Sequence, residues 1–177
     1  MIGRLAFAFL LGGATLLHAQ AIATASRVGD LQIGIGYTAA KPDYGQQSFQ
    51  GVAAYADFDF RPALGIEAEF HQVNSPNGDQ SYQRTYAIGG RYHRNYGPVA
   101  PYAKAMIGRG DFNYPQGLTN LGYNLFAGGL GADYMLGLHL RVRGEYEYQR
   151  WSGFPPSALT PQLVTFGVAY RFANRLR

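Results

Sequence analysis

The sequence predicts an all-β protein, an eight-stranded antiparallel up-and-down transmembrane β-barrel that follows a cleaved signal peptide. Three observations lead to this prediction. The chain begins with a short apolar segment of the kind that directs export. The remainder alternates apolar and polar side chains with a period of two in eight segments. The connections between these segments are alternately short and long, as in up-and-down membrane barrels.

The composition fits β-structure. The chain has 177 residues, the size of one domain, and is rich in Gly (24), Tyr (14) and Phe (11), which favours strands and tight turns. It has no cysteine, so neither a disulfide framework nor a thiolate metal site is available. The basic residues behind the net charge of +4 are scattered, so we expect no nucleic-acid partner.

The N-terminus has the three parts of a signal peptide. Arg4 supplies the positive charge, residues 5–17 form an apolar run, and Ala19-Gln20-Ala21 resembles a cleavage site. We therefore expect a signal peptide over residues 1–21 and an outer-membrane β-barrel domain over residues 22–177. The alternative, a transmembrane helix, needs about 20 apolar residues, and this run is shorter.

Eight segments of the remaining chain alternate like strands. The seventh has the clearest pattern, in which Leu140 and Val142 alternate with Arg141 and Arg143. The connections after the second, fourth and sixth segments are short, and the other four are longer and contain Pro and Gly. We expect the termini and short turns in the periplasm and the longer loops outside the cell. The expected strands cover residues 30–38, 51–60, 66–71, 84–93, 102–109, 121–134, 138–149 and 164–172.

Periodicity alone leaves open which face points outward. In a soluble sandwich or barrel the apolar face fills the core, whereas in a membrane barrel it meets lipid. The opposite faces mix glycines with charges of both signs, which suits a narrow filled lumen. Aromatic residues gather at the segment ends of the apolar faces, which is typical of membrane girdles: Tyr37, Phe58, Phe60, Tyr92, Tyr134, Tyr148, Tyr170 and Phe172.

Two segments resemble a known family. Residues 164–172 alternate up to Phe172 like the closing strand of small bacterial outer-membrane barrels, and residues 101–108 are similar to the fifth strand of OmpA-like and OmpX-like barrels. The resemblance implies a protein in the cell outer membrane, in contact with its lipid, and we expect this protein to be a monomer. It also implies that the closing strand is read by the barrel-assembly machinery.

The polar faces suggest an ionic network that closes the lumen. A proton relay, a metal site and a channel lining are the alternatives. We expect that losing one partner, for example in Arg141→Ala, costs about 3–5 kcal/mol in a dry site. His71 and His139 share the polar faces. The expected network residues are Asp57, Asp59, Glu67, Glu69, Arg91, His93, Lys104, Arg141, Arg143, Glu145, Glu147 and Arg171.

No motif predicts catalysis. No histidine has a serine two residues later, as in lipid A deacylase barrels, and no phosphate-binding G-x-x-x-x-G-K-S/T occurs. The histidines lack a metal-binding spacing. We therefore expect no enzyme, no cofactor and no metal, but a structural or interaction barrel with outward-facing loops. A narrow porin-like channel, a lipid-modifying enzyme and a soluble periplasmic ligand-binding barrel are the alternatives.

Three arginines share the parity of the apolar faces. Arg84, Arg109 and Arg150 lie at segment ends on the side expected to be extracellular. An outward arginine is costly at the bilayer midplane but not at the interface, and its planar fork suits phosphate. We expect contacts with lipopolysaccharide phosphates, or simple extension into water.

Overall fold

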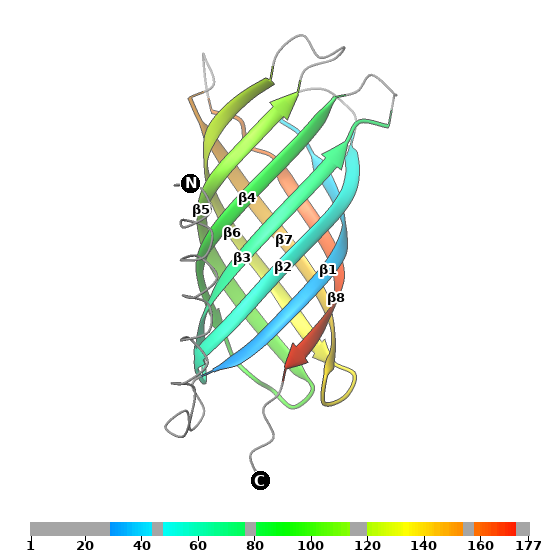
Figure 1. The fold of residues 1–177 in the computed structure, drawn as a ribbon, viewed down its shortest axis with the longest axis vertical. Helices are drawn as coiled ribbons and strands as arrows, with labels where there is room; N and C mark the ends of the chain where they lie inside the picture. The colour runs from blue at the N-terminus through cyan, green and yellow to red at the C-terminus, as the bar shows by residue number, and fades with distance from the viewer. Residues whose placement is uncertain (1–28, 44–47, 77–80, 114–119, 154–157, 173–177) are drawn as a thin grey trace, which may run out of the picture.

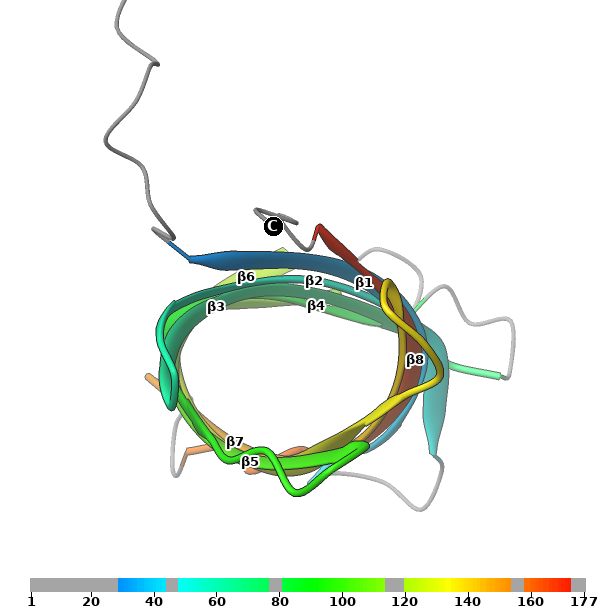
Figure 2. The ribbon, with the colours of Figure 1, turned by 90° about the horizontal axis from the view of Figure 1, so that it is seen from below.

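The computed structural model describes residues 29–43, 48–76, 81–113, 120–153 and 158–172. The expected signal peptide and residues 173–177 lie outside this part of the chain. Each strand pairs antiparallel with its sequence neighbours, and β1 pairs with β8, so the sheet closes into a barrel (Figures 1 and 2). The strands are β1 (Asp30–Lys41), β2 (Phe49–Arg61), β3 (Leu64–Asn74), β4 (Tyr82–His93), β5 (Val99–Asn113), β6 (Asn120–Met135), β7 (Leu140–Ser152) and β8 (Gln162–Phe172).

The strands are longer than the alternation predicted, mostly at the end with the longer connections. The predicted segment 102–109, for example, lies inside a strand that runs to Asn113. Gly108 and Gly110 have no side chain that could mark a face of the strand. The alternation in the sequence therefore ends before the hydrogen-bonded pairing with β4, which continues to Asn113. The predicted start of the seventh strand is wrong. Leu138 and His139 belong to the turn, and β7 begins at Leu140.

The outer face of the barrel is apolar, and its charged strand residues point mostly inward. Outward side chains such as Ile35 and Phe166 are 66% and 65% exposed, whereas the inward Glu67 and Asp133 are fully buried. A soluble barrel would have the reverse arrangement, because its apolar face must leave water. The alternation therefore favours the membrane alternative. Among the described residues, no helix is long and apolar enough to cross a membrane.

The interior has two layers. An apolar cluster around the fully buried Trp151 occupies the end with the longer connections and includes Phe112, Leu125 and Leu163. Charged side chains fill the end with the short turns, where β2 ends and β3 begins. The longer connections and the short turns lie at opposite ends of the barrel (Figure 1).

The turn between β4 and β5 shows how the short connections are built. Tyr96 and Val99 exchange two backbone hydrogen bonds, of 2.8 and 3.2 Å, around the pair Gly97-Pro98. Gly97 has a φ of 61°, which a side chain disfavours, so glycine suits the first central position of this tight turn.

Candidate functional site: the lumenal ion network

The charged side chains of the lumen come from six neighbouring strands. Successive residues of a strand point to opposite faces, so pairs two apart, such as Asp57 and Asp59 or Glu67 and Glu69, face the same interior. Carboxylates outnumber cationic side chains there, and each central cation is shared among several acids. We call this group the lumenal ion network: Asp57, Asp59, Glu67, Glu69, Arg91, Lys104, Asp133, Arg141, Arg143, Glu145 and Glu147.

Arg143 joins three carboxylates from three strands. Its Nη2 lies 2.5 Å from Asp57 Oδ2, its Nη1 lies 3.1 Å from Glu67 Oε2, and its Nε lies 2.9 Å from Asp133 Oδ1. The guanidinium carbon lies 3.9 Å from the ring centroid of Tyr55, a cation–π contact. Arg143 is thus held both by its charge and by its flat face.

Arg91 gives Asp133 a second cationic partner. Its Nη2 donates to Asp133 Oδ2, and its Nε lies 3.5 Å from Glu67 Oε2. Its guanidinium stacks 4.1 Å from the ring centroid of Tyr102. Arg141 is bound less closely, since its Nη1 lies 3.9 Å from Asp133 Oδ2.

Lys104 is the centre of a second cluster. Its Nζ lies 3.0 Å from Glu67 Oε1, 2.8 Å from Glu145 Oε1 and 2.8 Å from Glu147 Oε2, and it also donates to Glu69. Glu67 therefore links the two clusters, one oxygen on Arg143 and the other on Lys104. Glu67, Glu69 and Glu145 are close enough to hold a metal ion, but the Lys104 ammonium contacts all three.

A chain of hydrogen bonds connects the network to the apolar layer. Trp151 Nε1 donates to Gln149 Oε1 at 2.8 Å, and Gln149 Nε2 donates to Glu147 Oε1 at 2.6 Å. His71 Nε2 lies 3.7 Å from Glu69 Oε2. The indole N–H is thereby satisfied although the ring lies among apolar side chains, as a buried tryptophan requires.

The short-turn end of the lumen holds looser contacts. His93 Nδ1 lies 3.4 Å from Asp59 Oδ1. Arg171 pairs with Asp30 at the rim, where both side chains are partly exposed, and not with the central network. The lumenal assignment of His139 is wrong, because β7 starts after it. Its ring stacks 5.4 Å from that of Tyr170 on the outer face.

Three important lumenal residues escaped the sequence prediction. Asp133 contacts three arginines, and Tyr55 and Tyr102 supply the rings on which guanidiniums stack. Parity would have identified Asp133, since its neighbours on β6 belong to the apolar face. Parity also places Tyr55 on the face of Asp57 and Tyr102 on the face of Lys104, but it does not indicate that their rings stack on guanidiniums.

The three outward arginines lie near the longer connections. Arg84 donates to Gln72 Oε1 from Nη2 at 3.0 Å, and Arg109 Nε lies 3.6 Å from Asp111 Oδ1. The Arg109 side chain is 64% exposed, and Arg150 is exposed beside Phe126 on β6.

Comparison with known proteins identifies the family. Residues 6–172 match the model of the outer membrane protein beta-barrel domain. The chain belongs to this family. An outer-membrane β-barrel of this family has the apolar exterior seen here, so the soluble periplasmic alternative is wrong. No curated protein matched the chain.

Solved structures agree with this family in fold. Ail of Yersinia pestis is 19% identical, with 82% of this chain and 100% of that chain covered and a TM-score of 0.59. Neisserial surface protein A is 13% identical over 82% of this outer-membrane barrel and 98% of its own chain, with a TM-score of 0.65. OprG of Pseudomonas aeruginosa is 17% identical over 84% and 98%, with a TM-score of 0.59.

Proposed function

We propose that this outer-membrane barrel has a structural and loop-presenting role, with a lumen closed by the lumenal ion network. The observation that carries the proposal is the double contact of Glu67 with Arg143 and Lys104. It joins two clusters whose members come from opposite sides of the ring. A charge buried in this way is held only where its partners are well placed. This bridge between the clusters must be broken before ions can pass the charged layer.

The apolar layer supports closure at the other end. Trp151 is fully buried, and Met106 and Phe112 are 2% exposed in the same cluster. A constriction of such side chains excludes water and therefore ions. A narrow channel for small solutes is the rival proposal.

Conductance in planar bilayers tests closure. We expect no steady conductance from the wild-type barrel, from Lys104→Ala or from Trp151→Ala, because each single variant leaves one layer intact. The double variant Lys104→Ala/Trp151→Ala should conduct. The matched control Trp151→Ala/Arg171→Ala should stay closed, because Arg171 pairs at the rim. Steady wild-type conductance would favour the channel.

Catalysis on lipid is not part of the proposal. His71 and His93 are 3% and 4% exposed inside the barrel, and each lies beside a carboxylate, Glu69 or Asp59. A lipid substrate on the outer face does not reach either imidazole. His139 lies outside, but it packs on Tyr170.

We also propose two partners. The arginines at positions 84, 109 and 150 would contact lipopolysaccharide phosphates, since Arg109 is well exposed and guanidinium binds phosphate through paired donors. During biogenesis, the barrel-assembly machinery would read β8, whose terminal Phe172 is 49% exposed.

A further inference from the structure

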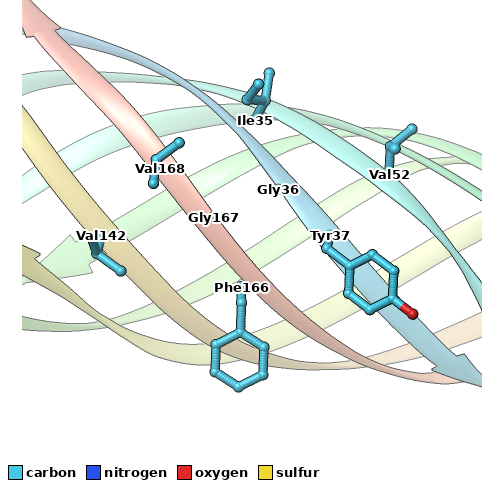
Figure 3. A pocket seen from close by; sticks show the side chains of 8 residues that line it. All are labelled: Ile35, Gly36, Tyr37, Val52, Val142, Phe166, Gly167 and Val168. Carbon is cyan, nitrogen blue, oxygen red and sulfur yellow. The ribbon is translucent and has the colours of Figure 1, made fainter.

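An open hollow lies on the outer face of the barrel, at the seam where β1 meets β8. Its floor is the backbone of Gly36 and Gly167, which are partners in the strand register. It is shallow and open on its outer side, with a volume of about 470 Å³. Six apolar or aromatic side chains surround the two glycines (Figure 3): Ile35, Tyr37, Val52, Val142, Phe166 and Val168.

The hollow is bordered by the paired Tyr37 and Phe166 on its long-loop side and by the paired Ile35 and Val168 on its short-turn side. Above Tyr37 the outer face of β1 continues with the small Ala39 and then with Lys41, which is exposed. Lys41 lies four residues beyond Tyr37, roughly 13 Å along the strand. Below Ile35, the paired side chains of Ile33 and Tyr170 fill the face.

We propose that this hollow holds one acyl chain of an anionic membrane lipid, whose phosphate binds Lys41. The surface lies in the hydrocarbon region of the outer membrane, so a lipid chain is the occupant that the surroundings supply. The lining is almost wholly apolar, as such a chain requires. The positive charge of Lys41 lies beyond Tyr37 toward the long-loop end, and on the outer face of β1 only the small side chain of Ala39 lies between them.

Photocrosslinking in nanodiscs tests the proposal. The folded barrel is placed in phosphatidylcholine that contains a little phosphatidylglycerol with a diazirine at the end of one acyl chain. After irradiation, adducts should concentrate on residues 35–37 and 166–168. Lys41→Gln should lower their yield about fivefold, the effect of one basic residue near an anionic surface. Val168→Trp, which fills the hollow, should lower it at least as much.

Ile88→Trp on β4 is the matched control. Ile88 is 55% exposed and Val168 48% exposed on the same apolar exterior, but Ile88 does not line the hollow. The control should leave the yield unchanged, and heat-modifiable gel migration verifies that each variant is folded. Adducts spread evenly over the exterior would overturn the proposal, as would a filled variant that keeps the wild-type yield. If Val168→Trp does not fold, the adduct distribution in the wild type still decides.

Discussion

Among single residues, Arg143 makes the most demanding contacts of the lumen. It is 1% exposed and binds carboxylates of β2, β3 and β6. Removing one partner from a buried ionic group leaves charge without compensation, which costs more than the pair contributes. Arg143 therefore contributes more to the stability of the barrel than its single charge suggests.

We expect Arg143→Met to lower the free energy of unfolding by about 3–5 kcal/mol. Water that enters the lumen and solvates the unpaired carboxylates would reduce this loss. Arg141→Met is the control with the same change of side chain. Arg141→Met should lower the free energy of unfolding clearly less than Arg143→Met does, because Arg141 has one ion pair, at 3.9 Å. Guanidinium unfolding in bilayers measures both values. Equal losses would contradict a network centred on Arg143.

The lumen also shows what a single sequence can reveal about such a site. Alternation on β3 and β7 is clear, so Glu67, Arg143 and Glu147 could be assigned to the polar faces. Asp133 was overlooked, although its neighbours Ala132 and Tyr134 mark the apolar face of the glycine-rich β6. Which cation meets which carboxylate depends on strand register and barrel stagger, and neither follows from the period of a strand.

At the level of elements, the pairing of β4 with β5 depends on glycines at close approaches. A Cβ on Gly89 would lie 2.0 Å from the carbonyl oxygen of Ala105, and one on Gly108 would lie 1.9 Å from that of Tyr86. Backbone atoms cannot yield as a flexible side chain does. Glycine is therefore needed where the backbones of β4 and β5 approach each other this closely.

Gly89→Ala and Gly90→Ala form a neighbouring pair that tests this requirement. We expect Gly89→Ala to cost about 1–3 kcal/mol by overpacking and to reduce the folded fraction on unheated gels. Gly90→Ala should fold like the wild type, since a Cβ there meets no heavy atom within 4 Å. Similar losses in both variants would mean that strand propensity, and not close approach, sets the effect.

For the whole molecule, the difference between the two ends implies an orientation. The short turns lie beside the start of β1 and the end of β8, and the longer connections lie opposite (Figure 1). Barrels of the bacterial outer membrane keep short turns in the periplasm. The sequence could predict this alternation because turn residues mark both kinds of connection.

Protease treatment of whole cells tests the orientation. We expect chymotrypsin to cut, if anywhere, near Tyr44, Tyr114 or Phe154, and a glycine-tolerant protease near Gly78. These residues belong to the four longer connections and lie outside the described residues. Cleavage confined to the short turns, for example at Tyr96, would mean that the barrel has the opposite orientation in the membrane.

The arginines of the outer face give the last prediction, which concerns the barrel in its own membrane. Replacing Arg84, Arg109 and Arg150 together by Gln keeps polar side chains at the interface, so the fold should persist. The variant should lose the thermal stabilisation that lipopolysaccharide gives the wild type in reconstituted bilayers, because glutamine offers phosphate no charge-assisted hydrogen bonds. The control replaces Arg61 and Arg94, which are exposed at the opposite rim, and should keep the stabilisation. If the triple variant is stabilised like the wild type, the arginines only extend into water, and the lipopolysaccharide contact is refuted.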